Sequence, residues 1–516
     1  MNRTDVTAAA RGGGIVFGGK LFAWGARFVL AVLLARLLGA AEYGLYTVAL
    51  SIAAVGSALA VFGLDSAMIR YLSIFAGRGD RERMRGSLQI GFAIPIGLSI
   101  LAATVLVVMA DAIATSVIGE PALAPLLRIT ALLVPAMVLN SLLAAMLQGL
   151  RQFGRSVLAE QFLQPTSRGV ILVVFALTGM SAALALIAML ISTIVVGVLM
   201  YVYLRRAVPR VGGATRPTGE IVRFSLPVYF SNVVHTFGGN LQTLLLGALS
   251  SVASAGIFAI ANQIQLVGSL FHAALVRAAM PLFAELHDSG ERSRLEHLYQ
   301  TTSKWTFSLN MPFFLVSIAF PEALMALFGP DFTDGAQALV ILAWGAIVNA
   351  ATGTSGAMLD MTGHSSIKLI NSTVSVGLAI GLNLLLIPSY GIVGAAIAAV
   401  AAVTAVNVLR VVEVARLEAV GPYNRTYLKP LAAGGMALAL GLVVGRLLLA
   451  DTPLVVSAGV GIVVIAASYV FLLRALGISD EDRFILGRAS DRIRRRRKPP
   501  DRTRTTPDPD VQGVAR

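Results

Sequence analysis

Apolar runs of about 20 residues recur along nearly the whole chain, and this feature limits the possible folds more than any other. Each run is long enough to cross the hydrocarbon core of a bilayer as a helix. Only 13% of the 516 residues are charged, whereas about a quarter are charged in a typical soluble domain. We therefore expect an all-α integral membrane protein.

The apolar runs predict about fourteen transmembrane helices. They are expected near residues 14–38, 44–66, 88–110, 124–148, 156–178, 181–204, 222–248, 253–278, 304–328, 336–360, 366–388, 391–415, 428–450 and 453–476. The 50 glycines fit helices that pack closely through small residues.

The second half of the membrane region repeats the first at an offset of 212 residues. The matches are Gly44 with Gly256, Met68 with Met280, Met146-Leu147 with Met358-Leu359, and Gly179 with Gly391. Each repeat holds six predicted helices, an even number, so both copies enter the membrane in the same direction. This parallel repeat predicts two six-helix lobes with a substrate path between them, plus two extra C-terminal helices.

This pattern predicts six consecutive regions. They are a cytoplasmic N-terminus (1–13), an N-lobe (14–206), a cytoplasmic linker (207–221), a C-lobe (222–418), helices 13 and 14 (428–476), and a basic, partly disordered cytoplasmic tail (477–516). Residues 478–492 of the tail could form a short amphipathic helix at the membrane surface.

Arginine and lysine gather in alternate loops, which sets the expected orientation. Five arginines lie in the predicted loop 67–87, and four lie in 205–221. The opposite loops are short and carry acids without lysine or arginine: Glu42, Asp111, Glu120, Asp331, Asp334 and Asp451. The positive-inside rule then puts both termini in the cytoplasm of a multi-pass inner-membrane protein. The net charge of +14 fits attraction to anionic lipids at the tail better than binding to nucleic acid.

Nothing in the sequence points to an enzyme. The chain has no cysteine, which excludes thiolate metal sites and cysteine nucleophiles. No Walker, HExxH or Ser-His-Asp pattern is present, and the outer loops are too short to hold an acceptor substrate. We expect no catalytic residues, no cofactor and no metal.

A charged residue inside a predicted span costs about 2.5–3.5 kcal/mol of insertion free energy. We therefore treat each such residue as a candidate functional residue. Lys20, Trp24 and Arg27 share one face of the first helix and would line a cavity. The alternative is that Arg27 is buried against helix carbonyls or a neighbouring carboxylate. Arg36 lies near the outer end and is expected to tie down the outer loop through Glu42.

Three other predicted helices carry polar stripes. The helix at 222–248 has Asn232, His235, Gly239 and Gln242; the helix at 253–278 has Asn262, Gln265, Ser269 and His272; and the helix at 336–360 has Asn349, Gly353, Gly356 and Asp360. Such stripes suit the wall of a hydrated, substrate-binding cavity. The alternative is hydrogen bonding between helices, worth about 0.6 kcal/mol per bond in membranes.

Asp65 and Arg277 are equivalent positions in the two repeats. A two-fold axis between the lobes would bring them together, so we expect them to form a gate that pairs across the cytoplasmic entrance when the outer side is open. The local alternative pairs Asp65 with Arg70 and leaves Arg277 extended to the membrane surface.

The segment Ala35-Arg36-Leu37-Leu38-Gly39-Ala40-Ala41-Glu42-Tyr43-Gly44-Leu45-Tyr46 resembles the Ala-Arg-x-Leu-Gly-Pro-x-x-Tyr-Gly-x-Tyr stretch of bacterial polysaccharide-export flippases. Ala40 replaces the usual proline. This family belongs to the multidrug/oligosaccharidyl-lipid/polysaccharide exporter superfamily, together with the lipid II flippase and the multidrug and toxin extrusion transporters.

The resemblance implies alternating-access transport of a polyprenyl-pyrophosphate-linked oligosaccharide from the inner to the outer leaflet, for cell-surface polysaccharide biosynthesis. Arg27 would then bind the pyrophosphate, helped by Lys20 and Arg277, and the polar stripes would bind sugar hydroxyls. Glycan polymerases or glycosyltransferases are the implied protein partners. The candidate ion-coupling acids are Asp360, Glu160 and Glu413.

Three alternatives remain open from the sequence. A lipid II flippase would share the helix count and the basic cavity. A multidrug or cation antiporter is disfavoured, because the first helix carries Lys20, Arg27 and Arg36 and no acid. A non-transporting scaffold that recruits a glycosyltransferase is disfavoured by the polar stripes.

Overall fold

The computed structural model describes residues 3–208, 213–268, 270–449 and 451–477, and these ranges contain helices and connecting loops without a β-strand. The all-α expectation is confirmed. The predicted tail helix and Ser269 lie outside the described residues.

The first half of the chain forms one lobe. Its elements are α1 (Arg3–Val61), α2 (Leu64–Arg78), α3 (Arg81–Ala112), the π-helix η1 (Ile113–Ile118), α4 (Leu123–Gly149), α5 (Phe153–Val157), the π-helix η2 (Leu158–Leu163), α6 (Gln164–Ala176) and α7 (Ala182–Ala207).

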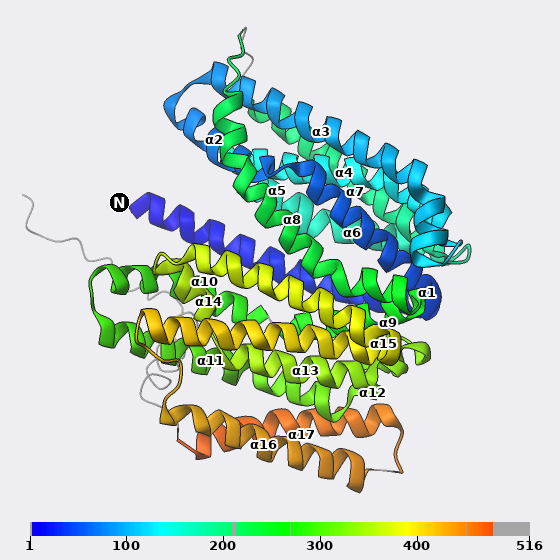
Figure 1. Ribbon diagram of the computed structural model, residues 1–516, viewed down its shortest axis with the longest axis vertical. Helices are drawn as coiled ribbons and strands as arrows, with labels where there is room; N and C mark the ends of the chain where they lie inside the picture. Colours follow the sequence, from blue (N-terminus) through cyan, green and yellow to red (C-terminus); the bar gives the residue numbers. More distant parts are fainter. Residues whose placement is uncertain (1–2, 209–212, 269, 450, 478–516) are drawn as a thin grey trace, which may run out of the picture.

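The second half forms the other lobe. Its elements are α8 (Thr218–Leu249), α9 (Val252–Gly268), α10 (Leu270–Asp288), α11 (Arg292–Ala319), α12 (Pro321–Ala326), η3 (Pro330–Gly335), α13 (Ala336–Ala351), α14 (Ser355–Met361) and α15 (Ser365–Leu417). Then follow η4 (Arg425–Tyr427), α16 (Leu428–Leu442), η5 (Val443–Leu448) and α17 (Leu454–Ala475). The last two long helices, α16 and α17, lie at the far edge of this lobe (Figure 1).

Eight helices in the described part of the chain are long and apolar enough to cross a membrane, or nine if bent α9 and α10 make one span. Two of the eight run over 44 and 48 residues, about 66 and 72 Å at 1.5 Å per residue, which is more than twice the thickness of the bilayer core. Each is broken once by a glycine with non-helical backbone angles, Gly39 (φ 70°, ψ 175°) in α1 and Gly391 (φ 51°, ψ −125°) in α15. Each therefore contains two spans, and the total of fourteen stays a prediction.

The predicted cytoplasmic loop 67–87 is wrong, because α2 occupies residues 64–78 and α3 begins at Arg81, which leaves only residues 79–80 as a loop. Positive φ angles at Phe62 (55°) and Gly63 (67°) end α1 and turn the chain into α2. Helical spacing then buries Met68, Leu72 and Phe75 in the N-lobe. The segment 279–303, between the helices predicted at 253–278 and 304–328, is likewise mostly helical, in α10 and α11.

The predicted helix 336–360 is also two helices, because the chain breaks between α13 and α14. Gly353 takes a positive φ of 62° in the break, and a Cβ there would lie 2.1 Å from Ser303 Oγ. Only glycine fits this close approach. Asn349 and Asp360 therefore lie on different helices and form no continuous stripe.

Hydrophobic packing differs between the two ends of the molecule. We name the end with loops 79–80, 150–152 and 289–291 the basic end, and the end with loops 119–122 and 327–335 the acidic end. One continuous hydrophobic core joins α1, α4, α7, α9 and α13 across both lobes. Two other cores belong to separate lobes and include Tyr71 in one and Tyr299 in the other. The lobes spread apart towards the basic end (Figure 1).

The join at the acidic end rests on the repeat-related glycines Gly44 and Gly256. A Cβ on Gly44 would lie 1.9 Å from the Val252 carbonyl oxygen, and one on Gly256 would lie 2.7 Å from Gly44 N. The backbones of α1 and α9 therefore touch where the two lobes meet. Tyr43 packs edge-on against Phe332, with ring centroids 5.8 Å apart.

Helix α8 connects the two lobes. Near its start, the Glu220 carbonyl accepts a 3.2 Å hydrogen bond from Tyr71 Oη of α2, and Tyr229 packs on Phe62. Its last part, including the buried Leu246, belongs to the core shared by both lobes. The beginning of α8 thus lies against the N-lobe, although the repeat assigns the helix to the C-lobe.

Candidate functional site

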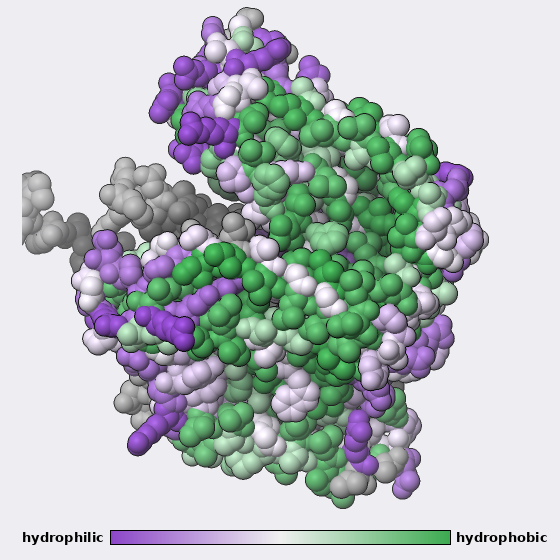
Figure 2. Space-filling model, in the orientation of Figure 1, coloured by the Kyte–Doolittle hydropathy of each residue, from purple (hydrophilic) through white to green (hydrophobic). Residues whose placement is uncertain are grey.

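The candidate site is the space between the lobes at the basic end. Figure 2 shows a belt of hydrophobic residues between two hydrophilic ends, and a notch between the lobes at the basic end. This belt matches a membrane-embedded body. The notch leads towards α1, which borders the inner face of the N-lobe (Figure 1).

Helix α1 supplies a cationic wall, which we define as Lys20 and Arg27 together with Arg168 of α6. Gly19 lets α1 approach α5 and η2 closely, since a Cβ there would lie 2.8 Å from Val157 Cγ1 of α5 and 3.2 Å from Phe162 Cε2 of η2. Arg27 is exposed, and Lys20 and Trp24 are half-buried. Arg27 lies within electrostatic range of Glu160 and Arg168, and Lys20 within range of Arg277 of the other lobe.

Arg168 was not singled out from the sequence. Its guanidinium hydrogen-bonds to Tyr46 Oη and lies 5.6 Å from the centre of the Tyr46 ring. Its buried Nε has no hydrogen-bond partner. The sequence could have indicated Arg168, because it is the only charged residue between Glu160 and Arg205 and lies inside a predicted span.

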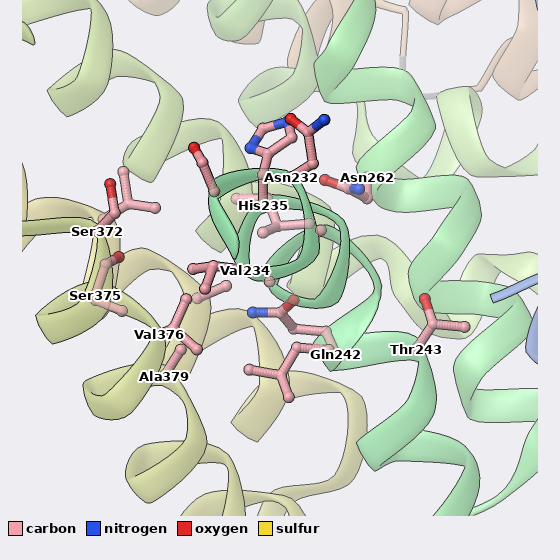
Figure 3. Close-up of a pocket in the computed structure, with 18 of the residues that line it drawn as sticks. Asn232, Val234, His235, Gln242, Thr243, Asn262, Ser372, Ser375, Val376 and Ala379 are labelled. Carbon is pink, nitrogen blue, oxygen red and sulfur yellow. The ribbon is translucent and has the colours of Figure 1, made fainter. Parts of the chain in front are cut away.

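The C-lobe contributes a polar pocket of about 730 Å³. Its lining includes Asn232, His235 and Gln242 from α8, and Asn262 from α9. Figure 3 shows Asn232 and His235 side by side, with Ser372 and Ser375 of α15 on the neighbouring helix. Gly239 of α8 and Asp360 of α14 also line it, so the structure brings together six residues that the stripes had singled out.

Two other stripe residues lie elsewhere, so the predicted stripe on 253–278 is only partly correct. Gln265 is buried, and its Nε2 donates a long 3.4 Å hydrogen bond to the Leu339 carbonyl of α13. His272 has a buried Nδ1 without a partner. Neither residue is in the lining of the C-lobe pocket. A bend of 48° separates α9 from α10 and breaks the single helical face that the sequence assumed.

Asp65 and Arg277 form no ion pair among the described residues. Asp65 lines a separate pocket of about 320 Å³ inside the N-lobe, with Asn140, Gln148 and Glu160, and its buried Oδ1 has no partner. The local alternative is also not formed, because the Arg70 guanidinium lies 4.7 Å from the centre of the Phe224 ring. The gate was predicted for a state with the acidic end open, and here that end is closed, so it stays a prediction.

Arg36 does fasten the acidic end, but not through Glu42. Its Nε donates a 2.7 Å hydrogen bond to the Leu327 carbonyl of the other lobe. Glu42 instead accepts a 2.7 Å hydrogen bond from the Ala182 backbone N–H at the start of α7. Arg36 thus ties α1 to the C-lobe, whereas Glu42 ties α1 to the start of α7 within the N-lobe.

Two lobes that close at one membrane end over a polar, partly cationic cleft are typical of an alternating-access transporter. The chain belongs to a family described as polysaccharide biosynthesis protein, whose model matches residues 33–336. The resemblance seen at residues 35–46, to polysaccharide flippases of the multidrug/oligosaccharidyl-lipid/polysaccharide exporter superfamily, is confirmed.

Individual relatives agree with this assignment. The chain is 25% identical to the probable low-salt glycan biosynthesis flippase Agl15 of Haloferax volcanii, over 32% of this chain and 36% of Agl15. It is 24% identical to the succinoglycan biosynthesis transport protein ExoT of Rhizobium meliloti, over 63% of each. The matched region thus spans less than two thirds of either relative.

Among solved structures, the fold is similar to that of the lipid II flippase MurJ in an inward closed conformation. The TM-score is 0.69 at 14% identity, covering 90% of this chain and 99% of MurJ. At this identity the likeness concerns the fold alone.

Proposed function

We propose that the protein is a flippase that moves a polyprenyl-pyrophosphate-linked oligosaccharide across the membrane by alternating access, for cell-surface polysaccharide biosynthesis. The observation that carries this proposal is the division of the cleft into two chemistries. A cationic wall lies on the N-lobe, and a polar pocket lined mainly by uncharged groups, with one acid and one arginine, lies on the C-lobe. A lipid-linked glycan has the matching parts, an anionic linkage and a hydroxyl-rich head.

The pyrophosphate is assigned to Arg27, with Lys20, Arg168 and Arg277 around it. A pyrophosphate that leaves water needs fixed cations, and the arginine fork suits bidentate contact with its oxygens. The proximity of Lys20 and Arg277 supports this assignment, because two cations from opposite lobes repel each other until an anion lies between them. Binding the anion would then favour closure of the lobes at the basic end.

The oligosaccharide is assigned to the C-lobe pocket. The amides of Asn232, Gln242 and Asn262 and the imidazole of His235 can each donate and accept hydrogen bonds. Sugar hydroxyls both donate and accept hydrogen bonds, so they need partners of both kinds. The lipid tail would remain in the bilayer, beside the cleft.

With the basic end in the cytoplasm of the inner membrane, the substrate enters from the inner leaflet. An inside-negative potential then favours outward movement of the anion by about 2.3 kcal/mol per charge per 100 mV. Of the three candidate coupling acids, Glu160 has a charge in range of Arg27. Anionic lipids and glycan-assembly enzymes are the proposed partners.

The test is translocation of a fluorescent polyprenyl-pyrophosphate oligosaccharide in proteoliposomes. Arg27→Ala should abolish it, because the main pyrophosphate contact is lost. Arg128→Ala is the matched control, since Arg128 forms an exposed ion pair with Asp111 at the acidic end, 2.7 Å apart. Failure of the wild type on this lipid, combined with export of organic cations, would contradict the proposal.

A further inference from the structure

Arg410 is a cation in the C-lobe that neither the stripes nor the repeat pointed to. It lies on the second half of α15, seven residues before the helix ends, and lines the C-lobe pocket with Asn232, His235 and Asp360. Seven residues correspond to about 10 Å of helix. The guanidinium therefore lies towards the basic end of the lobe, in the wall of the pocket.

Few of the N–H groups of the Arg410 guanidinium have a hydrogen-bond acceptor among the described residues. Among the residues that the structure describes, its one hydrogen bond to a side chain is a long contact, 3.4 Å from Nη1 to Asn407 Oδ1. Its Nε is buried and has no hydrogen-bond partner. In the described part of the chain, no carboxylate oxygen forms a salt bridge with it. A half-buried arginine left in this condition is costly, because its five N–H donors require acceptors.

Nearby acids act on Arg410 only at longer range. Asp360 and Glu413 lie close enough for their charges to interact with it. Glu413 is already occupied, because its Oε2 accepts a 2.6 Å hydrogen bond from Asn371 Nδ2. Asn407, for its part, donates a 2.8 Å hydrogen bond to Asn349. These bonds hold the surroundings of Arg410 in place without filling its donor sites.

Space is available at the guanidinium. Gly356 of α14 faces it, and a Cβ on this glycine would lie 3.7 Å from Nη1. The pocket beside it is wide and polar, and Figure 3 shows that Ser372 and Ser375 line its α15 side. A planar anion could therefore reach the N–H fork from the pocket.

We propose that Arg410 forms a subsite for an acidic sugar, with its guanidinium pairing with a carboxylate of the transported glycan. This inference rests on the proposed flippase function and narrows the substrate class to uronate-bearing or otherwise carboxylated oligosaccharides. The pyrophosphate is a separate anion, assigned to the opposite lobe. The hydroxyl and amide groups beside Arg410 suit the rest of the sugar ring.

The test uses two lipid-linked disaccharides that differ in one group, glucuronate in one and glucose in the other. Binding to the purified full-length protein is measured first. Arg410→Gln should weaken binding of the glucuronate lipid by about tenfold or more, because a charge-assisted pair is lost. Binding of the glucose lipid should stay within about twofold. Arg410→Lys should fall between the two, since it keeps the charge and loses the fork.

Equal weakening for both lipids, or no weakening for either, would overturn the subsite. If Arg410→Gln does not fold, Gly356→Val replaces it, because its added methyl groups crowd the guanidinium from α14. Translocation of the same lipids separates the two proposals. Loss of movement of both lipids in Arg27→Ala supports the flippase, whereas selective loss of the glucuronate lipid in Arg410→Gln supports the acidic subsite.

Discussion

Glu160 shows at the scale of one residue how an acid adjusts a cationic site. It lies in the π-helix η2, where the widened turn carries it towards the inside of the N-lobe. Its Oε2 accepts a 3.3 Å hydrogen bond from Ser156, and its charge acts on Arg27. π-helical turns are frequent at functional sites. Glu160 thus offsets part of the positive charge of the cationic wall.

Replacing Glu160 by glutamine should therefore tighten binding of polyprenyl pyrophosphate by about fivefold, the effect of roughly 1 kcal/mol of lost opposing charge. The dissociation constant in detergent measures this. Glu322→Gln is the control, because Glu322 pairs with Arg446 in another part of the C-lobe. Weaker binding in Glu160→Gln would mean that Glu160 orients Arg27 instead of competing for it.

The crossing of α1 and α9 is the element that closes the acidic end. Glycine at positions 44 and 256 removes the side chains that would hold the backbones apart. The equal offset in the two repeats places these glycines on both sides of the same crossing. Closure is thus built into the duplicated sequence, but only the packed structure reveals that the two copies meet each other.

Gly44→Val should open this crossing, because a Cβ would lie 1.9 Å from the Val252 carbonyl. Overpacking of about 1–3 kcal/mol would shift the population towards an open acidic end by about tenfold. The chain has no cysteine, so a single Ala40→Cys reports accessibility to an impermeant maleimide.

The matched control is Gly56→Val, also on α1, where the nearest atom to a Cβ is Val134 Cγ2 at an ordinary 3.6 Å. Labelling of Ala40→Cys should rise in the Gly44 variant and not in the control. Unchanged labelling in both would show that the crossing tolerates a side chain and does not set closure.

At the scale of the whole molecule, one core joins the lobes at the acidic end, and separate cores serve them elsewhere. Transport by alternating access requires the shared core to separate at the acidic end. The two lobes must then come together at the basic end instead. The structure is thus one of two expected states, the one open towards the basic end. Under the proposed mechanism, contacts between lobes at the acidic end, such as Tyr43 with Phe332, would have to break in every cycle.

A cross-link between Tyr43→Cys and Phe332→Cys should hold the acidic end closed and abolish translocation, and reduction should restore it. The control pair is Phe22→Cys with Phe162→Cys, whose native rings stack 4.8 Å apart within the N-lobe. That cross-link should leave translocation unchanged. Full transport with the first link in place would contradict alternating access.

The sequence determined the features that depend on local composition along the chain. Apolar runs of membrane length predicted the all-α spans, the 212-residue offset predicted two lobes, and Arg27 stood out as a charge at the middle of a helix that carries no acid. The helical period was also enough to predict that Asn232, His235 and Gln242 lie on one face of a helix. These results follow because hydropathy and helical period are properties of one segment at a time.

The tertiary structure alone decided which faces meet. It turned Gln265 into the core against α13, broke the stripe that contained Asp360, and formed α2 from an expected loop. It also placed Arg168 on Tyr46 and Arg410 at the pocket. The rotation and crossing of each helix are set by packing against helices distant in sequence. A periodic pattern in one helix fixes neither.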